Sequence, residues 1–144
     1  MITRFSHIGI VVKNLDEALP LYTNVLALQV LPGSRIDFPE LGFRSAIIPV
    51  GDLFIELMEG SNPNTELGSF IEKRGEGVYH LCFEVDDIDA EIESLTARGA
   101  DVIEIPPSAS VPAKRAFVRR RYMRGVLIEL VSKSEHEAET YQQK

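Results

Sequence analysis

Two histidines and two glutamates occupy matching positions in the two halves of this 144-residue chain. His7 opens the stretch HIGIVVKNLDEA and His80 opens HLCFEVDDIDAE, an offset of 73 positions. The same offset carries FIELM onto LIELV and places Glu56 on Glu129. In each half the histidine and the glutamate are therefore 49 positions apart. A repeat of this kind indicates two copies of one structural unit.

These residue types can bind a divalent metal ion. Two neutral imidazoles and two carboxylates balance the charge of such an ion and suit octahedral Co, Ni, Mn, Fe or Zn. Four protein ligands leave two of six positions for water or substrate oxygens, as a Lewis-acid catalyst requires. If the halves pack about a pseudo-twofold axis, the sequence predicts one metal site formed by His7, Glu56, His80 and Glu129.

Each of these residues, taken alone, could instead have a purely structural role. A single glutamate on a strand usually lies on the solvent-exposed face of an antiparallel sheet, and a single histidine there is usually structural. Glu56 shares one face of its strand with Phe54 and Met58. A buried carboxylate among such apolar neighbours needs a hydrogen-bonding partner or a metal ion. The shared spacing, rather than any one residue, favours the metal site.

The first half predicts a strand, a helix and about three further strands over residues 5–60. HIGIVV alternates with the period of a strand, and Asn14 with Glu17 three positions later is typical of a helix start. Pro20 falls inside this helix, so we expect a kink or an irregular turn there. After the loop LPGSRIDFPELG, strands are expected over FRSAIIPV and LFIELME.

The second half repeats this plan over residues 78–132. LCFEV predicts a strand, Asp86 or Asp87 begins a helix that runs to Leu95, and Gly99 ends it. Strands are expected near DVIEI, RAFVRR and GVLIELV, and a connecting helix is expected over residues 64–75, ending at Gly75. The polar tail 133–144 contains His136, which has no counterpart in the repeat. The predicted fold class is α+β, in a single domain spanning residues 1–144.

Composition excludes several functional classes. The net charge of −7 argues against nucleic-acid binding, which depends on neutralising phosphates. No apolar run is long enough to cross a membrane, and the start MITRFSHIG lacks the regions of a signal peptide. The single cysteine, Cys82, excludes an internal disulfide, and its mid-strand position favours packing over reactivity. We therefore expect a cytoplasmic protein.

The phrases HIGIVVKNLDEALPLYTNVLAL, EKRGEGVYHLCFEVDDIDA and GVLIELV together resemble the vicinal oxygen chelate superfamily, which includes glyoxalases, bleomycin resistance proteins and dioxygenases. The resemblance spans residues 5–132 and is strongest to the methylmalonyl-CoA epimerases, through GEGVYHLCFEVDDI. It implies two tandem βαβββ modules that form an open, cupped mixed sheet around one divalent ion, usually in a homodimer. The ligands that it implies are His7, Glu56, His80 and Glu129. Many epimerases have Gln where Glu56 stands, and Glu is the choice of the glyoxalases.

The resemblance also implies a reaction. It predicts a metal-dependent epimerase of methylmalonyl-CoA or a related 2-substituted malonyl thioester, acting through a metal-stabilised enolate and proton transfer at C2. Inversion needs a base on each face of the enolate. Glu129 is the candidate for one base. Some relatives place a second base, a glutamate, where this chain has Ser45, and Glu40 is a possible substitute.

A cluster of positive charges departs from the epimerase pattern. The segment VPAKRAFVRRRYMRG holds six cations and no acid: Lys114, Arg115, Arg119, Arg120, Arg121 and Arg124. This cluster suggests an anionic partner such as the phosphates of coenzyme A, with Arg119 and Arg121 on one face of an expected strand as the binding residues. The alternative is a solvated strand edge that discourages edge pairing.

Three other functions remain open. Glu56 favours a glyoxalase I-like isomerase of glutathione hemithioacetals. A non-catalytic small-molecule binding protein of the same fold typically loses the metal ligands, so the four residues retained here count against it. An extradiol dioxygenase is also less favoured, because it has one carboxylate in its iron site and usually a longer chain.

Overall fold

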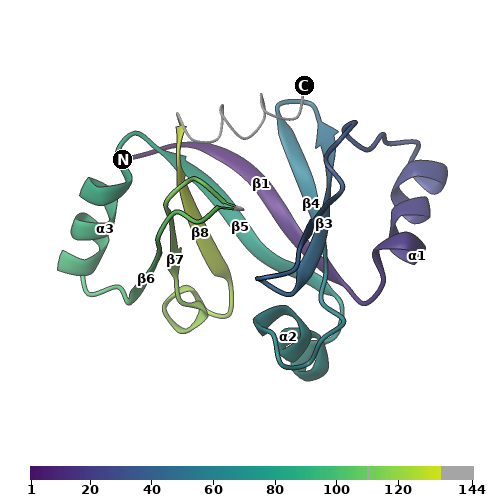
Figure 1. The fold of residues 1–144 in the computed structure, drawn as a ribbon. Coiled ribbons are helices and arrows are strands. Elements are labelled where there is room, and N and C mark those ends of the chain that lie inside the picture. The colour runs from purple at the N-terminus through teal and green to yellow at the C-terminus, as the bar shows by residue number, and fades with distance from the viewer. Residues whose placement is uncertain (110, 134–144) are drawn as a thin grey trace. The chain divides into compact units, whose positions relative to one another are not determined.

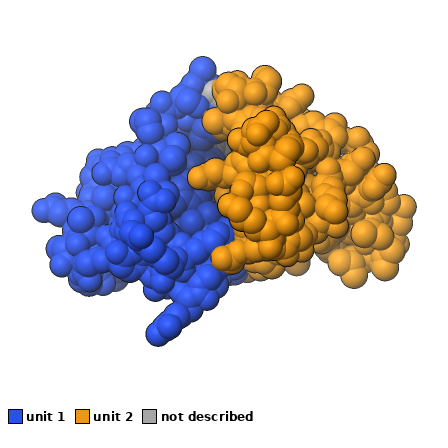
Figure 2. All heavy atoms as spheres, turned by 90° about the horizontal axis from the view of Figure 1, so that it is seen from below, with its two compact units in different colours: residues 1–7, 80–144 blue, residues 8–79 orange. Residues whose placement is uncertain are grey.

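The computed structural model describes residues 1–109 and 111–133. Within these residues the element order is strand, helix and three strands, then a connecting helix, then strand, helix and three strands again. The repeat read from the sequence is thus confirmed, and so is the α+β class. The chain forms two compact units, which Figure 2 colours separately: unit 2 is Ile8–Tyr79, and unit 1 joins Met1–His7 to His80–Lys144. The single domain expected from the sequence stays a prediction.

Unit 2 contains four strands in the order β2-β3-β4-β1, of which β1 (Ile2–Val12) begins in unit 1. β2 (Ile36–Phe38) pairs with β3 (Phe43–Val50), and β3 pairs with β4 (Leu53–Glu59), both antiparallel. The expected strands over FRSAIIPV and LFIELME are confirmed. The prediction missed β2, which lies inside the segment read as a loop and is only three residues long.

Helix α1 (Leu15–Pro20) begins where the sequence predicts. The Asn14 side chain accepts hydrogen bonds from the N–H groups of Asp16 and Glu17. At Pro20 the α-helix gives way to a π-helical turn, η1 (Leu21–Val25), as expected from a proline that cannot donate a hydrogen bond. One face of α1 packs on Ala46, Ile48 and Leu57 of the sheet, at the side of β3 and β4 seen in Figure 1.

Helix α2 (Glu66–Arg74) is the predicted connecting helix. The Thr65 hydroxyl accepts from the N–H of Gly68 at its start. Gly75 ends it with a φ of 80°, in the region where a side chain would be strained. The helix end at Gly75 read from the sequence is therefore confirmed, whereas the Thr65 cap was not predicted from it.

Unit 1 contains strands in the order β1-β5-β8-β7-β6. β5 (Gly77–Val85) runs parallel to β8 (Leu127–Ser132), whereas β7 (Arg115–Val118) is antiparallel to both β8 and β6 (Val102–Ile105). Helix α3 (Ile88–Ala97) begins at Asp87 and covers one face of these strands, as Figure 1 shows. That face forms a core that includes Val85, Ile92, Ala116, Ile128 and Leu130.

The strand predicted over RAFVRR is too long. β7 ends at Val118, and Arg120–Met123 form a 3-10 turn, η2. The strand alternation expected to place Arg119 and Arg121 on one face therefore does not apply, because Arg121 lies in a turn. Among the helices in the described part of the chain, none has the length and apolarity to span a bilayer.

In both units the predicted metal-binding glutamate lies on the face of the sheet away from the helix. In unit 2, Leu57 packs under α1, so Glu56 lies on the opposite face, where it pairs in register with Ile47. In unit 1, Leu130 and Ile128 pack under α3, so Glu129 between them lies on the face away from α3.

Glu59 links the sheet of unit 2 to the start of α1. Its Oε2 accepts a hydrogen bond of 2.9 Å from the N–H of Leu15 and one of 2.5 Å from Arg44. Burial raises the pKa of Glu59, but Arg44 and the Leu15 N–H outweigh burial and hold the pKa below its usual value. The ionised carboxylate therefore stabilises the fold.

We expect Glu59→Gln to lower the free energy of unfolding by about 1–3 kcal/mol at pH 7, because hydrogen bonds to a charged group are lost. Since the pKa is lower in the folded state, this stabilisation is present above the unfolded pKa and is lost as the pH falls through the folded pKa. Urea unfolding at several pH values measures both effects. The exposed Glu93→Gln is the control, expected to change stability by less than about 0.5 kcal/mol.

Candidate metal centre

The pairing of β5 with β8 brings His80 close to Glu129. In the parallel register His80 lies opposite Leu127 and Cys82 opposite Glu129. Residues at alternate positions of paired strands share a face, so His80, Cys82 and Glu129 all face away from α3. Strand β1 adds His7, whose ring centroid lies 5.0 Å from that of His80.

Three side-chain atoms converge within unit 1. His7 Nε2 and His80 Nε2 are 2.9 Å apart, and Glu129 Oε2 lies 2.9 Å from His80 Nε2 and 3.4 Å from His7 Nε2. The residues are 4%, 3% and 1% exposed, so these atoms are shielded from bulk water. Three of the four predicted ligands are thus close together.

These separations suit neighbouring ligands of one ion. Nitrogen and oxygen ligands lie about 2.1 Å from a first-row divalent metal, so adjacent ligands of an octahedral site are about 3.0 Å apart. Two of the three distances, at 2.9 Å, are close to this value, and the third, at 3.4 Å, is longer. The cluster could therefore hold a metal ion with only small movements of its side chains.

Glu129 is a buried but ionised carboxylate. Burial alone would raise its pKa, but the charge of His80 and of Arg115 and the contacts with His7 hold the pKa well below its usual value. Its Oε1 accepts a hydrogen bond of 2.9 Å from Arg115. Its Oε2 is buried and has no hydrogen-bond partner within the described residues, although it faces the two histidines. A buried acceptor in that position is the atom expected to bind a cation.

Cys82 belongs to the same cluster without matching its chemistry. Single atoms of His7, Cys82 and Glu129 lie within 4.8 Å of one another. Burial, with the charge of Glu129, raises the pKa of the Cys82 thiol to about 12. Without a bound ion the thiol is therefore protonated at neutral pH, and only the thiolate is a metal ligand. The complete burial of Cys82 confirms the predicted packing role.

Ser6 contacts the other nitrogen of His7. Its buried hydroxyl lies 3.1 Å from His7 Nδ1. A proton on Nδ1 would donate to this hydroxyl and leave Nε2 with a lone pair for an ion. Partners of this kind fix the tautomer and orientation of ligating histidines.

The fourth predicted ligand, Glu56, lies on β4 of unit 2 and is half-buried. Its place in the ligand set stays a prediction. The tail residue His136 lies outside the described residues.

The two arginines predicted to bind coenzyme A share one carboxylate. Arg119 Nε lies 2.8 Å and an Arg121 guanidinium nitrogen 2.5 Å from the same oxygen of Asp101. Their side chains are about half and two-thirds exposed. Two cations per anion leave a net positive charge at this surface, so the predicted role in phosphate binding stays open.

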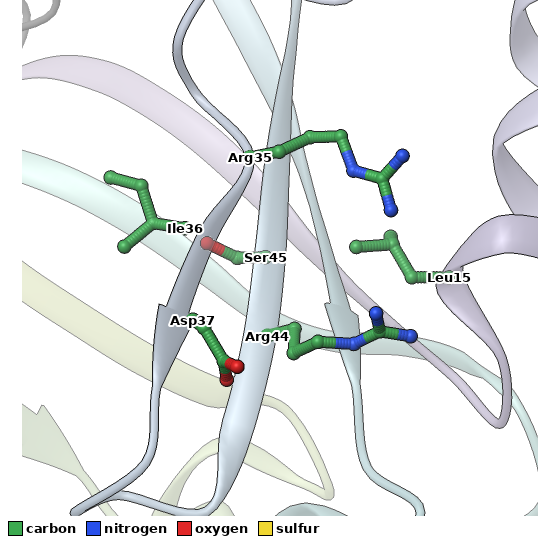
Figure 3. Close-up of a pocket in the computed structure, with 6 residues that line it drawn as sticks. All are labelled: Leu15, Arg35, Ile36, Asp37, Arg44 and Ser45. Carbon is green, nitrogen blue, oxygen red and sulfur yellow. The ribbon is translucent and has the colours of Figure 1, made fainter.

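Ser45 lines a surface pocket of unit 2 with a volume of about 180 Å³. Figure 3 shows Arg35 and Arg44, which also line it, extending on the side of Leu15 at the start of α1. Arg35 pairs with Asp16, and Arg44 pairs with Asp16 and Glu59. Within residues 1–109 and 111–133 no side chain hydrogen-bonds the Ser45 hydroxyl, so nothing there activates it as a base.

Two residues of the site were not assigned a role from the sequence. Arg115 was one of six cations in a cluster, and only the β7–β8 pairing singles it out. The only sequence feature that points to a role for Ser6 is its position next to His7. This feature is weak, because no spacing rule links a serine to a neighbouring imidazole.

We expect His80→Ala to abolish stoichiometric binding of Co²⁺ to protein freed of metal by a chelator, because one of three converging donors is removed. Isothermal titration calorimetry measures the binding, and circular dichroism checks the fold. His136→Ala, the third histidine of the chain, is the control that should bind like the unmodified protein. Full binding by His80→Ala would contradict the ligand assignment.

Ser6→Ala should weaken Co²⁺ binding about tenfold, since the ring of His7 loses the partner that orients it. The same titration measures this effect. Ser132→Ala removes a buried serine elsewhere in unit 1 and should leave the affinity unchanged. Equal affinities for the two variants would show that Ser6 does not orient His7.

Comparison with known proteins gives the family. The model of the Glyoxalase/Bleomycin resistance protein/Dioxygenase superfamily matches residues 6–118. An ethylmalonyl-CoA/methylmalonyl-CoA epimerase of Cereibacter sphaeroides is 32% identical over 90% of this chain and 98% of that protein. The mitochondrial methylmalonyl-CoA epimerase of Dictyostelium discoideum is 29% identical over 92% of this chain and 80% of that protein.

Solved structures agree with this result. A substituted form of the Streptomyces coelicolor methylmalonyl-CoA epimerase, in complex with 2-nitronate-propionyl-CoA, superposes with a TM-score of 0.81 and 27% identity. The superposition covers 92% of this chain and 95% of that one, and it confirms the vicinal oxygen chelate fold. The chain belongs to the Glyoxalase/Bleomycin resistance protein/Dioxygenase superfamily, with methylmalonyl-CoA epimerases among its homologues.

Proposed function

We propose that this protein is a metal-dependent epimerase of methylmalonyl-CoA or a related 2-substituted malonyl thioester. The observation that carries the proposal is the convergence of His7 Nε2, His80 Nε2 and Glu129 Oε2 on one buried point. Homologues with the epimerase name, and a neighbour in complex with an acyl-CoA analogue, support this substrate class over others of the superfamily.

The reaction needs a site that favours negative charge on the thioester oxygen. The proton at C2 lies between a thioester and a carboxylate, and its removal moves negative charge onto that oxygen. A divalent ion held by the three donors, with Glu56 as a proposed fourth, would supply positive charge there. Co, Ni, Mn, Zn and Fe all accept these ligands. Burial of the donors keeps water from weakening this interaction.

Inversion also needs two groups that move a proton. Glu129 is our candidate for one of them, in addition to its role as a ligand. Its lowered pKa makes it a weak base, so its contacts with Arg115 and His80 would have to loosen during the reaction. Ser45 has no activating partner within the described residues, and so the second base stays open, with Glu40 as the substitute raised from the sequence.

Binding of the coenzyme A portion would use the net positive surface at Arg119 and Arg121. The phosphates would compete with Asp101 for the two guanidinium groups. Homodimer formation and a cytoplasmic location stay predictions from the sequence.

A glyoxalase I-like isomerase is the second candidate. It is favoured by one observation, the glutamate at position 56 where many epimerases have glutamine. Such an enzyme would use the same donors while a proton moves within a glutathione hemithioacetal.

The test is incubation of Co²⁺-loaded protein with a single epimer of methylmalonyl-CoA in deuterated water. We expect loss of stereochemical purity together with deuterium at C2, measured by NMR and mass spectrometry. Glu129→Gln should slow both by about 10²–10⁴-fold, because it replaces a charged ligand with a neutral one and removes a proton carrier. Turnover of the hemithioacetal alone would favour the second candidate. Binding of methylmalonyl-CoA without any exchange would instead point to a non-catalytic binding protein.

A further inference from the structure

Strand β7 places Arg115 on the same face as Glu129. In the antiparallel register Phe117 lies opposite Glu129 and Arg115 opposite Val131. Arg115 and Phe117 are two positions apart, so both project from the face that carries the histidine cluster. Arg115 is thus a diagonal neighbour of Glu129, within reach of a long side chain.

The two oxygens of Glu129 face different groups. Oε1 accepts a hydrogen bond of 2.9 Å from the Arg115 guanidinium, whereas Oε2 lies 2.9 Å from His80 Nε2 and 3.4 Å from His7 Nε2. The Glu129 side chain is 1% exposed and that of Arg115 is 21% exposed. A charge-assisted hydrogen bond at this depth holds the carboxylate in one orientation.

We propose that Arg115 is a positioning residue that makes Glu129 a one-oxygen ligand. By holding Oε1, Arg115 leaves only Oε2 to bind the ion. A carboxylate without this partner can bind a metal through both oxygens and so fill a further coordination position. The position that Arg115 keeps open would accept the substrate oxygen, so the proposal rests on the proposed metal-dependent function.

This role differs from that of an arginine that merely stabilises the fold. The guanidinium is a cation beside a cation site, so its removal also takes away like-charge repulsion. Replacement of Arg115 by a neutral side chain should therefore keep the metal bound while changing how Glu129 binds it. An arginine of purely structural importance would produce the opposite pattern, a loss of metal together with a loss of fold.

The test compares the visible absorption spectrum of Co²⁺-loaded protein before and after Arg115→Met. We expect stoichiometric Co²⁺ in both, a changed ligand-field spectrum in the variant, and turnover of methylmalonyl-CoA reduced about 10- to 100-fold. Arg115→Lys keeps a cationic donor and should restore the spectrum in part. Arg98→Met, on an arginine whose side chain is 66% exposed at the end of α3, should leave the spectrum unchanged.

An unchanged spectrum in Arg115→Met would overturn the proposal, as would failure of the unmodified protein to bind Co²⁺. If Arg115→Met does not fold by circular dichroism, Arg115→Gln takes its place with the same expected spectral change. The spectrum does not depend on the substrate. A changed spectrum in a protein that turns over no thioester would therefore support the role of Arg115 while contradicting the proposed function.

Discussion

The burial of an ionised carboxylate is the constraint on which the described site depends. Glu129 is 1% exposed and keeps its negative charge, although an uncompensated buried charge costs several kcal/mol. The compensation comes from Arg115 on one side and the two histidines on the other. Both sources require the sheet of unit 1, because the parallel partner of β8 supplies His80 and the antiparallel partner supplies Arg115.

This arrangement changes the charge balance expected from the sequence. Two glutamates and a divalent ion would give a neutral site, whereas Arg115 adds one positive charge next to Glu129. A site with an additional positive charge favours anionic ligands over neutral ones. In the proposed function, the carboxylate of the malonyl thioester and the negative charge that would develop on loss of the C2 proton both fit this preference better than a neutral substrate would.

The sequence was informative wherever a local rule decided the outcome. The repeat predicted the strand that carries Glu129 and the convergence of His7 with His80, and the helix start at Asn14 and the helix end at Gly75 lie where expected. Features set by partner strands were not predictable. The end of β7 at Val118, the short β2 strand and the contact of Arg115 with Glu129 all depend on a register that no spacing in the chain specifies. The same limit applies to Glu56, whose place in the ligand set is still a prediction.

X-ray absorption at the cobalt edge of the Co²⁺-loaded protein tests the central claim most directly, because it reports the atoms bound to the ion. The account predicts only nitrogen and oxygen neighbours at about 2.0–2.2 Å, with the outer scattering of two imidazoles. A sulfur neighbour at about 2.3 Å would place Cys82 among the ligands and contradict the assignment of a protonated thiol. A spectrum with fewer than two imidazoles would contradict the convergence of His7 and His80 on one ion.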